Sequence, residues 1–541
     1  MSARATLTRT AKLLVADQAR GRLGPKTQSA IQSHESRPDH VFELVDLIAA
    51  EAARKRPDDD LLQAYAVLLA HGLEQLRYDV ERNLPATIAL VGRLRAHLIA
   101  RGDGGRIDPT TLLLVLNQFA AAKLDMGDDL RQLMQRLIEQ ANKSPAGFVE
   151  GSGNGTLLSG LARELGHDVF AIHEQLHDNA EAMPDDMRAA MAMATFAEQE
   201  TSVREAALGF LLNSSQAARA KLAELVETAA PHGVVSPTML RRMTVMRNWL
   251  REPDRPALDA AIAACRSSGV ASAAWPKAEV SRVLASGFDG AGAQTVIVVT
   301  VTGNKRTLAG LLVKQGFGVR DTWVRRGLRK AEAIKLIEHA GAEIGLAPSS
   351  LDYVGQLARG FLATNLQSGV QPPFSLLDFA ETVGISDLSP DTATLDQRIA
   401  ALCAQVDPAR LTEDEVLETM HTSGEWPARH DILTTWFEDD AARVLGSRTA
   451  PFDKQMAVML AGPLQARRQR WAELVAWTAL SLKLQPGSTV PDGKQWEGFA
   501  ILARELAGKR PLDQIGLMHV IAHTSIQVMG MDRLLGTREA A

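Results

Sequence analysis

Two histidines separated by three residues are the pair whose spacing most directly suggests chemistry in this sequence of 541 residues. They lie in the segment His173-Glu174-Gln175-Leu176-His177. On a helix, side chains four residues apart share one face, so both imidazoles could bind one zinc ion. Glu174, between them, would be placed to act on a metal-bound water.

This H-E-x-x-H segment resembles the zinc site of the zincin metallopeptidases. The resemblance implies that zinc is the cofactor, that His173 and His177 are ligands, and that Glu174 is the catalytic base. At the position of the family's third ligand this chain has Phe196. Glu198, the candidate third ligand, and Glu200 only lie close to that position. A core stripe also explains the helix, with the histidines at its edge: Leu158, Leu161, Leu165, Val169, Ile172 and Leu176. We therefore favour no catalytic residue and no metal here, and keep the peptidase as the enzymatic alternative.

His519 and His523 repeat the four-residue spacing near the C-terminus. Their neighbours Leu517, Met518 and Ile521 are apolar, which indicates a buried helix. We interpret both histidines as core residues.

Basic residues gather between positions 301 and 335, with only Asp321 and Glu332 opposing them. Lysine and arginine beside aromatic rings can hold single-stranded nucleic acid, or present a positive face to a protein. The simpler interpretation is a solvated face that pairs with acidic segments such as 438–440. The candidate partner-binding residues are Lys305, Arg306, Lys314, Arg320, Trp323, Arg325, Arg326, Arg329 and Lys330.

The composition bounds the class of protein. The chain is 46% hydrophobic and 23% charged with a net charge of -5, which favours a folded protein and excludes a dominant global attraction to nucleic acid. Its two cysteines exclude a disulfide framework. The apolar segment 296–313 is cut by charged residues, so no membrane span is expected. The basic N-terminus lacks the apolar core of a secretory signal, and we expect a tail and a cytoplasmic location.

Helical periodicity covers most of the chain. Between residues 59 and 80 the apolar residues follow the spacing of one helix face, and 40–53, 86–99, 110–124 and 130–141 repeat it. Short connections imply antiparallel neighbours, either bundled or stacked as a solenoid. The same periodicity returns from residue 331 to the end.

The segment 200–226 contains two similar helices in tandem. Val203-Arg204 is followed by Ala207 and Leu211, and Ala218-Arg219 by Leu222 and Val226 at comparable offsets. This pattern resembles the helices of HEAT-like repeats, in which the arginine caps a turn. The resemblance covers only this segment and implies a helical-repeat binding scaffold.

One β-rich segment interrupts the helices. Residues 294–302 are almost entirely β-branched, and Gly303-Asn304 supplies a two-residue turn before 305–313. Both strand faces are largely apolar, so the hairpin should pack against helices on at least one side.

These patterns predict a mainly α fold, with antiparallel helical pairs of repeat or bundle type in two regions flanking a small β-hairpin module. The expected parts are a basic tail (1–30), a helical repeat-like domain (31–268), the hairpin module with its basic patch (269–330) and a C-terminal helical domain (331–541). The favoured function is a non-enzymatic scaffold with a protein partner and no cofactor. A nucleic-acid-binding accessory protein using residues 301–335 is the other alternative.

Overall fold

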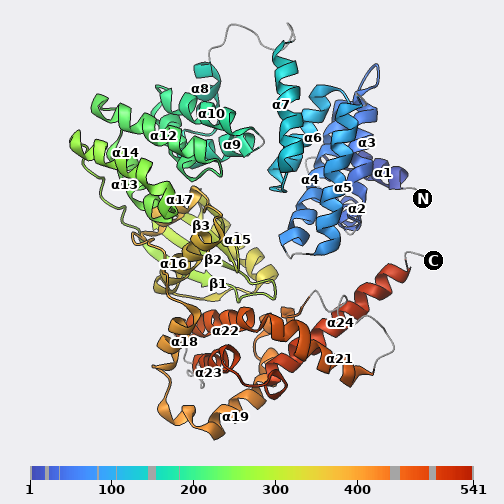
Figure 1. The fold of residues 1–541 in the computed structure, drawn as a ribbon, viewed down its shortest axis with the longest axis vertical. Helices are drawn as coiled ribbons and strands as arrows, with labels where there is room; N and C mark the ends of the chain where they lie inside the picture. The colour runs from blue at the N-terminus through green and yellow to red at the C-terminus, as the bar shows by residue number, and fades with distance from the viewer. Residues whose placement is uncertain are drawn as a thin grey trace. The chain divides into compact units, whose positions relative to one another are not determined.

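The computed structural model describes residues 3–18, 24–35, 37–81, 84–104, 107–143, 154–181, 183–438, 451–486 and 495–538 (Figure 1). The chain forms two compact units, Met1–Leu225 and Val226–Ala541. The fold is mostly helical, with one small antiparallel sheet of five strands, which confirms the expected fold class. No described helix is long and apolar enough to cross a membrane.

The first unit begins with a group of helices around one leucine-rich core. They are α1 (Ala3–Gln18), α2 (Pro25–Glu35), α3 (His40–Ala52), α4 (Asp59–Glu81), α5 (Pro85–Asp103), α6 (Pro109–Ala121) and α7 (Gly127–Lys143). Helices that follow one another in sequence pack together, as α3 does with α4 and α6 with α7. The apolar stripes found in the sequence therefore face one another.

The N-terminal residues correct the expectation of a tail over 1–30. Residues 3–18 form α1, which packs on α4. Leu7, Ala11 and Leu14 are at most 3% exposed. Their spacing of four and three residues makes one apolar stripe, whose burial stabilises the helix although its other faces are basic.

The first unit continues with α8 (Asn154–Glu164), α9 (Val169–Glu181), α10 (Asp185–Ala197), α11 (Thr201–Ala207) with a 3-10 turn at Leu208–Leu212, and the start of α12 (Gln216–Ala229). An arginine is the fourth residue of α10, α11 and α12. Arg204 donates to the carbonyl of Glu198 at 2.6 Å, and Arg219 to that of Asn213 at 2.7 Å. Arg188 likewise donates to the carbonyl of Glu181 at 2.7 Å. The arginine thus caps the preceding turn in all three helices, which is the contact expected for residues 204 and 219.

The second unit is built around the sheet. It opens with α13 (Pro237–Met246) and α14 (Arg255–Ser267). The strands are β1 (Val280–Ala285), β2 (Ala293–Thr302), β3 (Lys305–Lys314), β4 (Gly318–Leu328) and β5 (Ala347–Pro348), in the order β4-β3-β2-β1-β5. The β2–β3 hairpin is confirmed with its two-residue turn, where Gly303 has φ +55°. β1, β4 and β5 were not predicted.

Helices cover both faces of the sheet. On one face Ile297, Val299 and Leu308 pack against Ala333 and Ile337 of α15 (Lys330–Ile344). The other face meets α16 (Leu351–Ser368) and α17 (Ser375–Val383), which contact β3 and β4. Helices thus pack on both faces, which confirms the expectation that the hairpin packs against helices on at least one side.

The remaining helices are α18 (Leu395–Cys403), α19 (Glu413–Thr422), α21 (Phe452–Met459), α22 (Arg468–Lys483), α23 (Gln495–Ala507) and α24 (Gly516–Arg538). The α22 and α23 helices pack closely, and Trp471, Trp477 and Phe499 are buried at 3% exposure or less.

The expected domain boundaries at 268 and 330 differ from the observed division at residue 225. Hydrogen bonds tie the sheet to the C-terminal helices: Gln315 Nε2 donates to the carbonyl of Arg470 at 3.1 Å, and Trp436 Nε1 to that of Phe288 at 2.8 Å. Trp249 Nε1 donates to the carbonyl of Leu388 at 3.0 Å. The sheet thus lies in one compact unit with the helices on either side of it in the sequence.

Candidate partner-binding surface

The strand register brings most of the candidate cations to one end of the sheet. Lys305 and Arg306 begin β3 beside the hairpin turn, and Arg306 pairs with Leu328 at the end of β4. Arg329 and Lys330 follow directly, and Arg325 pairs with Leu308 two residues further into β3. We call these five residues the cationic end.

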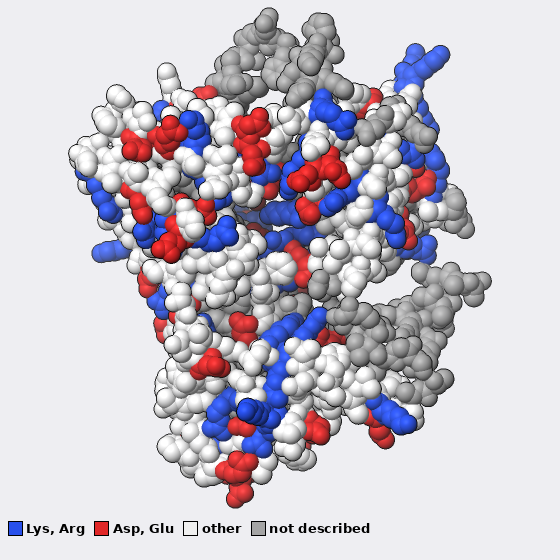
Figure 2. Space-filling model, in the orientation of Figure 1, with Lys and Arg blue, Asp and Glu red and all other residues white. Residues whose placement is uncertain are grey.

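One carboxylate lies against the cationic end: Glu332 accepts a hydrogen bond from the backbone N–H of Arg329 at 2.7 Å. In the part of the chain that the structure describes, no Asp or Glu carboxylate forms an ion pair with any of the five residues. Four of them are exposed and Arg306 is half-buried. Figure 2 shows lysines and arginines mixed with acidic residues over much of the visible surface. Uncompensated cations in one place are therefore available to an anionic partner.

Trp323 lies on β4 two residues before Arg325 and on the same face of the sheet, because strand side chains alternate. It pairs with Gly310 of β3, and a Cβ at residue 310 would overlap the indole ring. The ring therefore lies over the glycine, and the residue is still 41% exposed. This is a large aromatic surface beside the cationic end.

Three of the nine predicted residues do not join this surface. Lys314 and Arg320 lie against the ring of Phe317, 5.1 and 5.9 Å from its centroid, near the β3–β4 turn. Nine residues of extended strand separate Lys305 from Lys314, about 30 Å. Arg326 pairs with the carboxylate of Asp378 in α17, on the opposite face. The single predicted patch is thus divided between separate positions.

The acidic segment proposed to neutralise the patch has other partners. Glu438 is buried and accepts from Arg467 Nη1 at 2.7 Å and from Trp471 Nε1 at 2.9 Å. Asp439 and Asp440 lie outside the described residues. Glu438 therefore belongs to the core around α22.

Sequence reasoning missed Arg282, an exposed cation on the same face of the sheet. It pairs with Val299, which pairs with Leu308 and through it with Arg325 in one row across the strands. The signal was present in the run Val-Ser-Arg-Val-Leu-Ala at 280–285, which is too short to stand out beside the long hairpin.

The histidine segment lies on α9 with the spacing that was predicted. The ring centroids of His173 and His177 are 5.6 Å apart, and His173 packs edge-on against Phe210. Burial lowers the pKa of His173 to about 3, helped by the charge of His177 and opposed by a hydrogen bond with the backbone of Ala206. His173 is thus a neutral core residue.

Nothing in the described chain completes a metal site around this pair. Glu174 is exposed, and Glu198 follows the last residue of α10. His177 Nε2 lies 3.9 Å from the carboxylate of Glu181, which also receives Arg188. Among the residues placed by the structure, no three His, Cys, Asp or Glu side chains are grouped to hold a metal ion.

We expect protein purified without chelators to contain far less than one equivalent of zinc. Zinc binding needs donors about 2.0–2.2 Å from one point, and a third donor is not grouped with the two imidazoles. Metal analysis of the wild type and of His177→Ala decides the matter. One equivalent of zinc that disappears in the variant would restore the peptidase hypothesis.

His519 and His523 correct a second expectation. Both imidazoles are exposed, while Leu517, Met518 and Ile521 of the same helix are fully buried. His519 Nε2 lies 2.8 Å from the carbonyl of Asp513, and His523 Nε2 lies 3.4 Å from the side-chain amide of Gln527. The apolar neighbours mark the buried face of α24, and the histidines lie on its other face.

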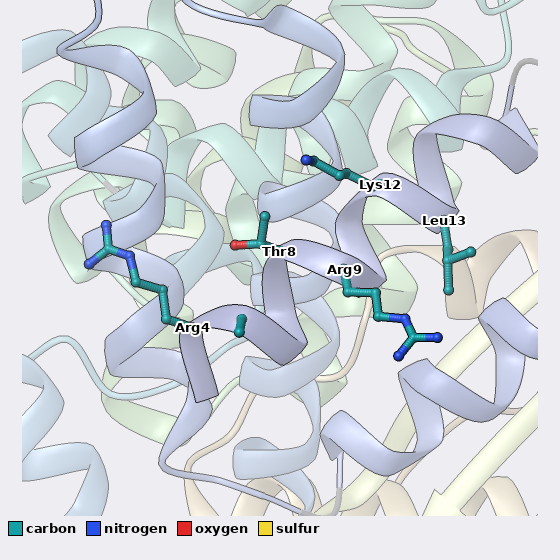
Figure 3. Close-up of a pocket in the computed structure, with 6 residues that line it drawn as sticks. Arg4, Thr8, Arg9, Lys12 and Leu13 are labelled. Carbon is teal, nitrogen blue, oxygen red and sulfur yellow. The ribbon is translucent and has the colours of Figure 1, made fainter. Parts of the chain in front are cut away.

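A concave surface on α1 is also lined by basic side chains, but these do not converge. A hollow of about 700 Å³ on α1 is lined by Arg4, Ala5, Thr8, Arg9, Lys12 and Leu13 (Figure 3). Its three basic side chains point in different directions, and Arg4 pairs with Glu43 at 3.5 Å. They do not converge on one ligand position.

The fold and this surface define a mostly helical protein with a central antiparallel sheet whose cationic end is uncompensated. Residues 184–269 match the model of the Y4lR second domain, and residues 396–530 match that of the Y4lR C-terminal helical domain. The chain is similar to the uncharacterized protein y4lR of Sinorhizobium fredii, with 24% identity over 501 residues, 90% of this chain and 92% of the relative. No solved structure matches the chain. In the sequence, the strands of the sheet lie between the two matched segments.

Proposed function

We propose that this protein is a non-enzymatic binding scaffold that holds an anionic macromolecular partner at the cationic end. One observation carries the proposal: five cations without an ion pair to the described carboxylates lie at one end of the sheet, and Arg325 among them is two residues from the exposed ring of Trp323. Like charges held together raise the free energy of the unbound protein, and an anionic partner relieves that repulsion. The surrounding helices act as a rigid support, since α15 begins at the cationic end and packs on the sheet.

The α10–α12 segment supports the scaffold part of this proposal. Three helices in succession fasten their first turn with the same arginine contact. Helices joined in this way present their outer faces in series, which is how helical-repeat scaffolds offer extended binding surfaces.

We expect the double variant Arg325→Glu/Arg329→Glu to leave a heparin column at lower salt than the wild type. Heparin serves here as a polyanionic probe, and the variant reverses two of the five cations. The matched control is Arg266→Glu/Arg429→Glu, which makes the same charge change at exposed arginines elsewhere in the second unit. Equal shifts of the two double variants would mean that only net charge matters, and would remove the cationic end as a site.

The thermal unfolding midpoint of the same variants shows whether a loss of heparin binding comes from a loss of stability. Arg325 and Arg329 are exposed and have no ion pair with the described carboxylates, so their reversal should change stability by less than about 0.5 kcal/mol. Arg326→Glu should instead lower the midpoint, because it places a like charge against Asp378, whose side chain is only 8% exposed. Arg326 is therefore left out of the binding variant.

A further inference from the structure

We infer that the partner held at the cationic end is single-stranded nucleic acid, with one base stacked on Trp323. The inference rests on the proposed function and adds the chemistry of the partner. It depends on the placement of one aromatic ring and one carboxylate on the sheet and of five cations toward its end.

Trp323 is placed as a stacking surface. Because its indole lies over Gly310, the ring is supported from beneath by the neighbouring strand. With 41% of the residue exposed, much of the ring is open to a ligand. Leu312 and Thr295, in the next row of the same face, are only half-buried, so α15 leaves this part of the sheet uncovered. Every base has an aromatic face, and stacking on a tryptophan contributes about 1–3 kcal/mol per base.

The cations lie at the distance that a nucleic-acid backbone requires. Arg325 is two residues along β4 from Trp323, about 7 Å. Leu328, which ends β4 after a bulge, pairs with Arg306, four residues along β3 from the partner of Trp323, about 14 Å. Arg306 shares the face of Trp323 in the strand alternation, and Arg329 and Lys330 follow Leu328. A base on Trp323 would thus have the phosphates of the next few nucleotides beside Arg325 and the rest of the cationic end.

One carboxylate sets the direction. Asp321 lies two residues from Trp323 on the side away from Arg325, and it is exposed. Phosphates would be repelled there, so the backbone should run from Trp323 toward the cationic end.

The same features favour a single strand over other polyanions. A duplex keeps its base faces inside the stack, and an acidic peptide uses the cations but has no flat ring for Trp323. A chain with a net charge of -5 gains no global attraction, so binding must come from this local surface and should depend steeply on salt.

The test measures fluorescence anisotropy of labelled 20-nucleotide oligo(dT) and oligo(rU) with the full chain at 50 and 200 mM salt. We expect binding that Trp323→Ala weakens by roughly tenfold to a hundredfold, the equivalent of losing one stacked base. Trp323→Phe should keep most of the affinity. Phe452→Ala, which removes another exposed aromatic side chain, 45% exposed, is the matched control and should change nothing.

A second pair of variants tests the phosphate contacts. Arg325→Gln/Arg329→Gln should reduce the slope of log K against log salt by about 1.4, since each phosphate contact with a single strand contributes about 0.7. Arg266→Gln/Arg429→Gln should leave the slope unchanged. Gly310→Ala is a third variant. Its methyl group would displace the Trp323 ring and leave the cations in place, so it should weaken binding as Trp323→Ala does without changing the salt slope.

A labelled 20-residue polyglutamate distinguishes the possible failures. If polyglutamate binds as tightly as the oligonucleotides and Trp323→Ala has no effect, an acidic protein is the partner, and the inference is wrong while the proposed function stands. If neither probe binds at 50 mM salt, or neither responds to Arg325→Gln/Arg329→Gln, both are wrong. Preferential binding of oligo(dT) or oligo(rU) that depends on Trp323 supports both.

Discussion

Glu381→Ala is expected to lower the free energy of unfolding of the second unit by about 3–5 kcal/mol, because it leaves two buried arginines without their carboxylate. Arg241 donates to Glu381 Oε1 at 2.7 Å, and Arg242 donates to Oε1 at 3.0 Å and to Oε2 at 2.9 Å. All three side chains are 12% exposed or less. Burial alone would raise the pKa of Glu381, but the hydrogen bonds and charges of Arg242 and Arg241 outweigh it and lower the pKa.

This cluster joins α13 to α17, and α17 covers the face of the sheet opposite Trp323. Arg241 is held further by the carbonyl of Ala274 at 2.7 Å and by the ring of Trp275. Breaking the cluster should therefore loosen the support of β4. Urea unfolding followed by tryptophan fluorescence measures the effect, since all eight tryptophans lie after residue 225.

The matched control for Glu381→Ala is Glu279→Ala, which removes an exposed carboxylate in the same unit. A triple variant with methionine at 241, 242 and 381 should recover much of the loss, because it removes the charges together and keeps apolar volume. A loss below about 1 kcal/mol for Glu381→Ala would mean that water reaches the arginines and compensates them.

The hairpin was predictable because its signal is local. Eight β-branched residues in a row, 295–302, and a Gly-Asn pair determine strand, turn and register together. The strand β4 was not predictable in this way, because Arg320, Arg325 and Arg326 interrupt its apolar residues. Its bulges, near Arg306 and near Val313, also break the alternation that identifies a strand.

The candidate site was predictable in composition but not in arrangement. The sequence shows nine basic residues near two aromatic residues, yet the register alone decides that Arg306 pairs with Leu328, just before Arg329, and that Arg326 faces away. The support of Trp323 by Gly310 depends on pairing between strands thirteen residues apart. The apolar stripe of α1, in contrast, is visible in the spacing of Leu7, Ala11 and Leu14. It was missed because the surrounding basic residues made the segment resemble a tail.

His173 should make the first unit sensitive to acid. Its pKa is lowered to about 3 in the folded protein by burial, against 6.5 for the ordinary group, so between these values the unfolded chain binds more protons. The contribution of neutral His173 to the free energy of unfolding is therefore fully present above pH 6.5 and is lost as the pH drops toward 3. Two pH units below 6.5, the lost stability is about 3 kcal/mol.

We expect His173→Phe to remove this share of the acid sensitivity. Phenylalanine keeps a planar ring beside Gly209 and Phe210 but binds no proton, although its extra volume has its own cost. The measured quantity is therefore the difference in unfolding free energy between pH 7 and 4.5. Circular dichroism follows the helices of both units, and tryptophan fluorescence follows the second unit alone, because residues 1–225 contain no tryptophan. His71→Phe, at an exposed position of α4, is the control and should keep the wild-type difference. If His173→Phe also keeps it, the imidazole of His173 is protonated in the folded state at pH 4.5, and α9 must admit water to the core around residue 173.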